Sequence, residues 1–140
     1  MEFKIKNTDN IIIYFGLLIP ISFLILGILC IILNIQDFSL TDLLLGMFSI
    51  LFSVYGFIVV YKISTCQYKS LIINSDTNTL KLVNGNNYVE IPLKEIAKIC
   101  SKYAFGKGKQ YSCVYIHTKQ GMVYSVAIYD YETLRSKLPE

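Results

Sequence analysis

The chain has 140 residues, of which 54% are hydrophobic, and its mean hydropathy of +0.49 is high for a soluble domain of this length. Its net charge is only +3 and it contains no nucleotide-binding fingerprint, so nothing favours a nucleic-acid partner. The charge is unevenly distributed along the chain. Residues 1–61 hold two basic and four acidic residues, a net charge of −2, whereas residues 62–140 hold eleven basic and six acidic residues, a net charge of +5.

The first long apolar run, residues 11–33, reads IIIYFGLLIPISFLILGILCIIL and contains no charged side chain. A membrane-spanning helix needs about 20 consecutive apolar residues, whereas a soluble core helix of about 10 to 14 residues keeps a polar face. This run has no polar face at a helical period. It therefore predicts transmembrane helix 1 at 11–33, after a cytoplasmic segment at 1–10. We interpret Pro20 as a kink, which membrane helices tolerate.

A signal peptide is the alternative interpretation of this run, because Lys4 and Lys6 resemble a charged n-region. The run is longer than an h-region of about 7 to 15 residues, and no A-x-A-like cleavage site follows it. We therefore favour a retained span.

A second apolar run follows at 43–61, reading LLLGMFSILFSVYGFIVVY, and predicts transmembrane helix 2 at 43–62. The polar break at 34–42 is then an extracytoplasmic loop. Small residues spaced by three, four and three share one face of the second helix and allow another helix to approach closely. They predict a helix-packing seam, either within the hairpin or between copies in a homo-oligomer, made of Gly46, Ser49, Ser53 and Gly56.

The placement of basic residues predicts the orientation of this hairpin. Lys4 and Lys6 precede the first run and Lys62 and Lys69 follow the second, whereas the loop at 34–42 has no Lys or Arg. Cytoplasmic flanks of membrane helices carry the excess of basic residues. We therefore expect a multi-pass protein of the bacterial inner membrane with both termini in the cytoplasm.

From residue 68 onward the hydrophobic period becomes two, which is typical of β-strands. Turn residues separate the strands, including Asn-Gly at 84–85, which is a strong hairpin signal. The last segment opens with Asp130 as a helix N-cap and ends with basic residues. We expect strands at 68–74, 79–84, 88–93, from about 97 to 103 or 104, 111–118 and 122–129, a single helical turn at 93–96 and a helix at 130–138.

The run LKLVNGNNYVEIPLKEIAKI at 80–99, followed by a hairpin, a strand, KQG, a strand and a helix, resembles the bacterial pleckstrin-homology-like (PH-like) domains attached to membrane hairpins. In those domains a V-E-I-P-L-x-E-I pattern links two strands, as residues 89–96 do here. The resemblance covers about 66–138. It implies a bent antiparallel β-sheet sandwich or open barrel capped by the C-terminal helix. The expected fold class is thus an α+β membrane protein, with a two-helix transmembrane hairpin before this β domain.

No catalytic, metal-binding or cofactor-binding set is recognisable, so we expect a protein that is not an enzyme. The only histidine, His117, lies four residues from Cys113 in one strand, about 13 Å away at 3.3 Å per residue, which is too far for a dyad. The four cysteines have no C-x-x-C spacing, and in a reducing cytoplasm we expect free thiols. Cys66 is a candidate juxtamembrane palmitoylation site.

The second half of the β domain is rich in lysine and tyrosine, which are residues that contact lipid headgroups and protein partners. The alternative explanation for the tyrosines is ordinary strand composition, because strands favour Tyr. The candidate partner or lipid surface consists of Lys102, Lys107, Lys109, Lys119, Tyr103, Tyr111 and Tyr115.

Two functions of different classes follow. The first is a membrane-anchored module that presents its PH-like domain to a protein partner, such as a subunit of a membrane complex, or to anionic membrane lipid. The alternative is an immunity protein that neutralises a membrane-targeting antibacterial toxin through its spans or its 34–42 loop.

Overall fold

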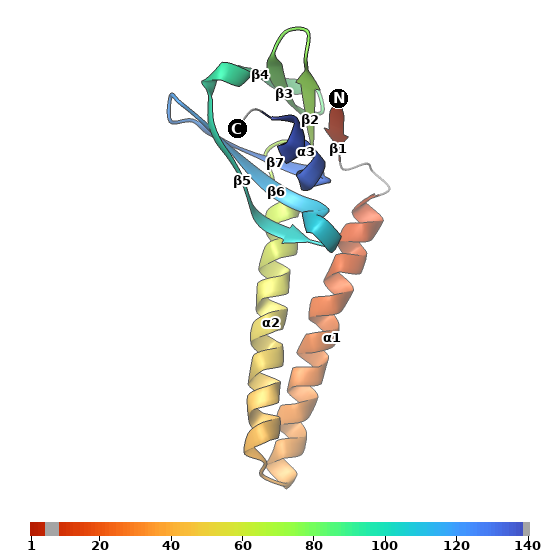
Figure 1. The fold of residues 1–140 in the computed structure, drawn as a ribbon. Helices are drawn as coiled ribbons and strands as arrows, with labels where there is room; N and C mark the ends of the chain where they lie inside the picture. Colours follow the sequence, from red (N-terminus) through yellow and green to blue (C-terminus); the bar gives the residue numbers. More distant parts are fainter. Residues whose placement is uncertain (5–8, 139–140) are drawn as a thin grey trace. The chain divides into compact units, whose positions relative to one another are not determined.

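The structure is a computed structural model that describes residues 1–4 and 9–138. It contains two long apolar helices, two small antiparallel sheets and a C-terminal helix, which confirms the α+β organisation (Figure 1). The chain divides into two compact units, one made of residues 8–61 and the other of residues 1–7 and 62–140.

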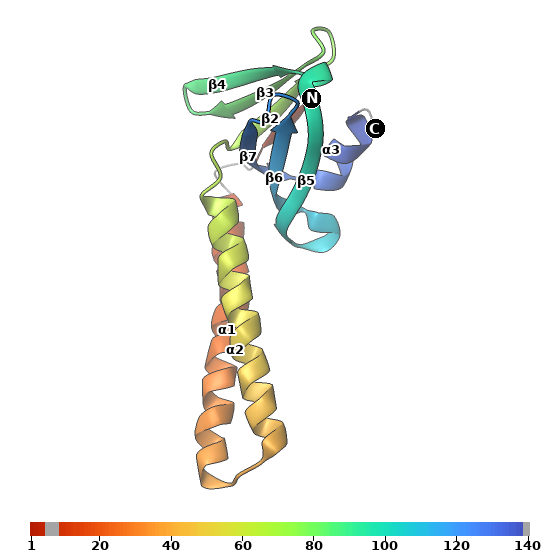
Figure 2. The same ribbon diagram turned by 90° about the vertical axis from the view of Figure 1, so that its left-hand side faces the viewer.

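The first unit is a helical hairpin. Helix α1 (Asp9–Gln36) and helix α2 (Leu40–Ser64) run antiparallel and lie side by side (Figures 1 and 2). Both are long and apolar enough to cross a membrane, and only 11% and 28% of their most apolar windows are buried. Both helices extend beyond the predicted spans, and the connection shortens from the predicted 34–42 to residues 37–39.

Side-chain capping explains why this connection is so short. The Asn34 side-chain amide donates to the Ser39 carbonyl oxygen. The Asp42 N–H donates to Ser39 Oγ at 3.4 Å, so Ser39 caps α2 and Asp42 lies in its first turn. The Ser39 hydroxyl and the Asp42 carboxylate both favour a helix start at Leu40. Hydropathy alone places these residues in the loop, because the second apolar run begins only at Leu43.

The small residues of α2 face α1. Ser49 and Ser53 are buried, and Ser53 Oγ donates a hydrogen bond of 2.7 Å to the Pro20 carbonyl oxygen. A Cβ added to Gly46 would lie 3.1 Å from the Gly27 carbonyl oxygen, and one added to Gly56 would lie 2.7 Å from the Pro20 ring. The predicted seam residues therefore lie at the helix–helix contact inside the hairpin.

The second unit begins with a four-stranded antiparallel sheet in the order β1-β2-β3-β4. Its strands are β1 (Glu2–Lys4), β2 (Ser70–Asn74), β3 (Thr79–Asn84) and β4 (Asn87–Pro92). The β3–β4 turn has Gly85–Asn86 at its centre, with a positive φ of 60° at Gly85, so the turn lies one residue later than an Asn-Gly turn at 84–85. Pro92 ends β4 at the edge of the sheet, where no ladder hydrogen bond is lost.

Strand β1 was not predicted. The sequence predicts only a cytoplasmic N-terminal segment at 1–10 and no strand within it, but Phe3 pairs with Leu71 and the Ile73 N–H donates to the Met1 carbonyl oxygen at 2.8 Å. Three residues are too few to show an alternating pattern. Because β1 precedes the hairpin and β2 follows it, both ends of the hairpin connect to strands of one sheet.

A three-stranded antiparallel sheet follows in the order β5-β6-β7. It is formed by β5 (Ile96–Phe105), β6 (Tyr111–Thr118) and β7 (Val123–Tyr129). A single helical turn (Leu93–Glu95) precedes β5, as predicted, and another (Lys107–Lys109) lies in the β5–β6 connection. Tyr68 was predicted to start a strand, but it pairs instead with Val126 of β7, so β2 begins at Ser70.

Helix α3 (Tyr131–Lys137) closes the second unit. Its N-cap is Asp130, as predicted, whose Oδ1 accepts a hydrogen bond of 3.2 Å from the Thr133 N–H. Leu134 is fully buried and packs with residues from both sheets. The core of this unit consists of Leu71, Ile73, Leu80, Leu82, Ile91, Val114, Ile116, Val126, Ile128, Tyr131 and Leu134.

Candidate functional site: a basic groove between β5 and α3

The β domain contains a groove of about 600 Å³ between the start of β5 and helix α3. Pockets that hold ligands usually measure about 300–1,000 Å³. The groove is lined by Leu93, Lys94, Ile96, Ala97, Lys98, Ile99, Lys119, Tyr131, Arg135 and Leu138.

Helix α3 supplies one wall through a single face. Tyr131 and Arg135 are four residues apart on α3 and therefore lie above one another, and Leu138 follows as the C-cap residue of the helix. Leu134 points to the core at the same time and anchors the helix. The Asp130 cap fixes where the helix starts, since its second carboxylate oxygen also accepts a 2.6 Å hydrogen bond from the Thr133 hydroxyl. The wall is therefore held by packing and capping together.

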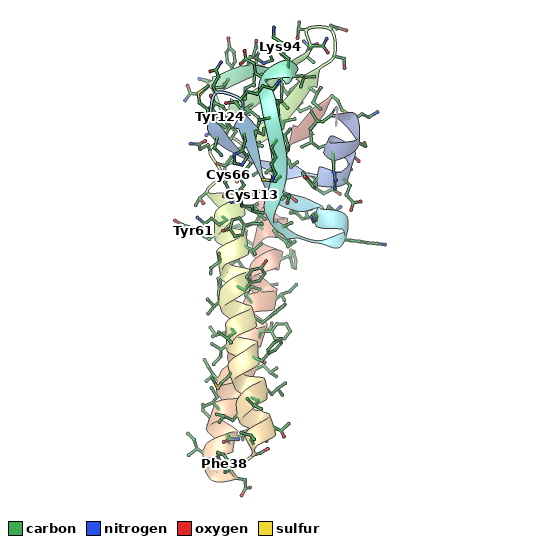
Figure 3. The ribbon with its side chains drawn as sticks, turned by 60° about the vertical axis from the view of Figure 1, so that its left-hand side comes forward. Phe38, Tyr61, Cys66, Lys94, Cys113 and Tyr124 are labelled. Atoms are coloured by element: carbon green, nitrogen blue, oxygen red, sulfur yellow. The ribbon has the colours of Figure 1, made fainter. Side chains whose placement is uncertain are left out.

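The opposite wall is the start of β5. Lys94 lies in the helical turn just before this strand (Figure 3). The pairing of β5 with β6 skips a residue between Ile96 and Lys98, which is a bulge at Ala97. The Lys119 N–H donates to the Glu95 carbonyl oxygen at 2.8 Å, so the end of β6 is joined to the turn. This bond brings the Lys119 side chain to the groove.

The groove is strongly basic. Four cations line it, Lys94, Lys98, Lys119 and Arg135, and no carboxylate is among its lining residues. Within the described part of the chain, the one ion pair joins Lys81 to Glu90 at 3.4 Å, so none of the four cations has an acidic partner. Clustered like charges without counter-charges raise the local positive potential and attract an anion.

The floor of the groove is apolar. Leu93, Ile96, Ile99 and Leu138 are partly buried and pack against the core. The groove thus combines cations at its rim with aliphatic side chains beneath them. This arrangement suits binding of an anionic group that has apolar neighbours.

The predicted surface residues do not form one patch. Lys119 lines the groove, and Lys109 Nζ lies 5.8 Å from the ring centre of Tyr131, which also lines it. Lys102 Nζ lies 5.4 Å from the ring centre of Tyr115, away from the groove lining. Lys107 lines a smaller cavity of about 430 Å³ beside Asp130 and Glu132.

Two of the tyrosines lie together on the other face of the second sheet, and one is in the interior. Tyr103 of β5 lies opposite Cys113 of β6, and Tyr115 is two residues after Cys113 on β6. Because alternate residues of a strand point to the same side, the rings of Tyr103 and Tyr115 share a face of the sheet. Tyr111 has only 6% of its surface exposed and stacks on Phe105 with ring centres 4.9 Å apart. The prediction that Tyr111 belongs to an accessible partner surface is therefore wrong, because its side chain is buried.

Three groove cations were missed as site residues by the sequence reading, namely Lys94, Lys98 and Arg135. They come from segments that are distant in the sequence, and only the packing of α3 beside β5 brings them together. A weak signal did exist, because Lys94 and Lys98 flank an apolar strand start and Arg135 is the only arginine.

A second cluster contains two buried thiols. Cys66 and Cys113 lie next to each other (Figure 3), and both are almost inaccessible, with 5% and 1% of their surface exposed. The Cys66 thiol donates to the Lys62 carbonyl oxygen at 3.3 Å. The polar interaction with this neighbouring thiol, together with Tyr115 and the charges of Lys62 and Lys69, lowers the pKa of Cys113 to about 7. The same interaction with Cys113, and then burial, raises the pKa of Cys66. Burial, followed by the nearby Cys113, raises the pKa of Tyr115 to about 12.

His117 has a sulfur neighbour, although not the one weighed from the sequence. Its Nε2 lies 3.9 Å from Cys100 Sγ, on the adjacent strand β5, while Cys113 is further along its own strand. The Cys100–His117 separation is at the outer limit of a sulfur hydrogen bond. Within residues 1–4 and 9–138, no group of three or more His, Cys, Asp or Glu side chains is arranged to hold a metal ion.

Comparison with known proteins gives no relative for this chain. No protein family, no curated protein and no solved structure matches it.

Proposed function

We propose that this protein is a non-enzymatic, membrane-anchored binding module. In this proposal the α1–α2 hairpin spans the bacterial inner membrane, and the β domain binds an acidic protein partner at the cytoplasmic face. The observation that carries the binding function is the basic groove, in which four cations without an acidic partner among residues 1–4 and 9–138 lie beside apolar side chains.

The exposure of the hairpin supports its insertion in a membrane. A soluble protein buries its apolar helices, yet large apolar side chains along both helices are exposed, including Phe15, Ile35, Phe48 and Leu51 at 61–80%. Hydrocarbon is the solvent that suits such a surface. The pairing of β1 with β2 adds a topological argument, since strands at both ends of the hairpin must lie on the same side of the membrane.

The strand order supports the PH-like assignment of the β domain. Four antiparallel strands in chain order, then three more, and a C-terminal helix packed on the core agree with the bent sandwich that the resemblance implies. Such a fold is a scaffold on which binding sites differ, so the site has to be argued separately.

The groove favours a protein over a lipid headgroup as its ligand. Its cations flank aliphatic side chains along a strand and a helix, which suits an acidic segment with apolar side chains between the acids. An anionic leaflet would attract the +5 charge of residues 62–140 in general, at about 1 kcal/mol per basic residue near the surface. This general attraction to the leaflet does not require cations gathered in a groove.

The test is crosslinking of the intact, tagged protein in its cells, followed by mass spectrometry. Two triple variants are compared with the unchanged protein. One reverses the groove charges (Lys94→Glu, Lys98→Glu, Arg135→Glu), and the other makes the same charge change away from the groove lining (Lys102→Glu, Lys107→Glu, Lys137→Glu). We expect one stoichiometric protein partner, which the first variant loses at least about tenfold and the second retains.

Three results would contradict the proposal. Recovery of only lipid and copies of the chain would remove the protein partner. Equal loss of the partner in both variants would mean that binding depends on net charge and not on the groove. Loss in the second variant alone would move the site to the surface around Lys102 and Lys107. A secreted toxin as the groove-dependent partner would identify the module as an immunity protein.

A further inference from the structure

Strand β5 is an edge strand with an open side. In the second sheet the order is β5-β6-β7, so β5 pairs only with β6 among the described strands. It is also the longest strand, with ten residues. An edge strand presents unpaired backbone N–H and C=O groups, and these are a template for another extended chain.

The open side of β5 adjoins the basic groove. Residues 96–99 of β5 form one wall of the groove and α3 forms the other, and Figure 2 shows β5 at the margin of its sheet next to α3. A chain lying in the groove would therefore have a backbone partner on one side and side-chain contacts on the other. Recognition of extended peptides beside a sheet edge uses the same combination.

Charge decides what kind of chain fits there. A second copy of this protein that paired through its own β5 would bring Lys94 and Lys98 against the same two cations. Like charges opposite one another destabilise a strand pair. An acidic strand instead gains from them, and its alternate side chains would point to the apolar floor at Leu93, Ile99 and Leu138.

We propose that the groove binds its partner as an extended acidic segment, added as a strand to β5, with acidic side chains on the groove cations and apolar side chains on the floor. This inference rests on the proposed binding function and specifies the chemistry and backbone geometry of the partner.

The test uses the full chain in phosphatidylcholine nanodiscs and a fluorescent octapeptide of alternating Val and Glu as the probe. Two analogues carry N-methyl groups on alternate amides, one on the Val nitrogens and one on the Glu nitrogens. Only one edge of an added strand faces β5, so one analogue is expected to lose at least about tenfold in affinity while the other retains it. A Val–Lys octapeptide should not bind.

A second measurement locates the peptide. Hydrogen exchange of the backbone amides in residues 96–101 should slow when the Val–Glu peptide is bound and stay unchanged with the Val–Lys peptide. The Arg135→Glu variant should weaken binding, and Lys137→Glu, two residues away on the same helix but outside the groove lining, should not.

Failure of this inference is distinguishable from failure of the proposed function. If the Val–Glu peptide does not bind, or if both methylated analogues bind as tightly as the parent, strand addition is refuted. The in-cell partner and its dependence on the groove cations would still stand, since that crosslinking result does not depend on backbone geometry. Conversely, if crosslinking in cells recovers no groove-dependent protein partner, the proposed function is overturned, whatever the result with the peptides.

Discussion

At the scale of single residues, the two buried thiols are the groups whose chemistry the fold changes most. Cys66 comes from the segment before β2 and Cys113 from the middle of β6. Two thiols in contact cannot both ionise easily, because the second thiolate would face the first. The proton therefore stays on Cys66, whose pKa is raised, and leaves Cys113, whose pKa is lowered to about 7.

This pair predicts how stability depends on pH. The folded pKa of Cys113 lies below its ordinary value of 9.0, so between about pH 7 and 9 the unfolded chain binds more protons and folding becomes more favourable as pH rises. The contribution of Cys66 to this pH dependence has the opposite sign, because the pKa of Cys66 is raised in the folded protein. The free energy of unfolding therefore falls above about pH 9. We expect maximal stability near pH 9, with a rise on the order of 1 kcal/mol per pKa unit.

Chemical unfolding of the detergent-solubilised protein from pH 6 to 11 measures this dependence. Cys113→Ser should abolish the rise between pH 7 and 9, whereas Cys100→Ser, another thiol in the same sheet, should leave it in place. A flat profile in the unchanged protein would show that Cys113 is not stabilised as a thiolate.

At the scale of helices and strands, the parts of the fold that could be predicted are those with local signals. The two apolar runs, the alternation in β3 and β6 and the Asp130 cap all report on neighbouring residues, and these elements lie where the sequence placed them. The helix ends were less accurate, because Asn34 and Ser39 act through capping bonds that are not visible in hydropathy.

Features that depend on distant contacts could not be predicted in this way. Strand β1 exists because β2 offers it an edge, and Tyr68 leaves its predicted strand because β7 offers another partner. The groove has the same origin, since Lys98 and Arg135 are placed together only by the packing of α3. Candidate residues chosen by type and by neighbourhood in the sequence therefore included only Lys119 from the groove lining.

The helix–helix contact gives a prediction at this scale. Gly46→Leu places a side chain where even a Cβ lies 3.1 Å from the Gly27 backbone oxygen and 3.0 Å from Ile31 Cγ1. Backbone cannot move aside as a flexible side chain does, so the hairpin should be destabilised by about 1–3 kcal/mol. Thermal unfolding in detergent measures this effect.

Met47→Leu is the matched control for this variant, since Met47 is the next residue on α2 and is 52% exposed. It should unfold at the same temperature as the unchanged protein. If Gly46→Leu also unfolds unchanged, close approach at Gly46 does not contribute to the hairpin, and the seam would have to serve another contact.

At the scale of the whole molecule, the pairing of β1 with β2 constrains how the chain can cross a membrane. Phe3 and Leu71 lie in one sheet, and the entire hairpin lies between them in the sequence. A chain that crossed the membrane an odd number of times between these residues would separate the two strands. The sheet therefore requires two crossings or none, and the proposed hairpin makes two, in keeping with the length and exposed apolar surface of both helices.

Cysteine labelling of intact cells tests this topology. In a Cys100→Ser background, a membrane-impermeant maleimide should label Phe38→Cys, because Phe38 lies in the α1–α2 connection and is 79% exposed. It should label Lys137→Cys, at the end of α3, only after the cells are permeabilised. This expected labelling pattern rests on the proposed orientation, in which the basic flanks at Lys4, Lys6 and Lys62 lie on the cytoplasmic side. Labelling of Lys137→Cys in intact cells would mean that the orientation is inverted and would rule out a cytoplasmic partner of the β domain. Protection of both positions in intact cells would mean that the hairpin does not cross the membrane.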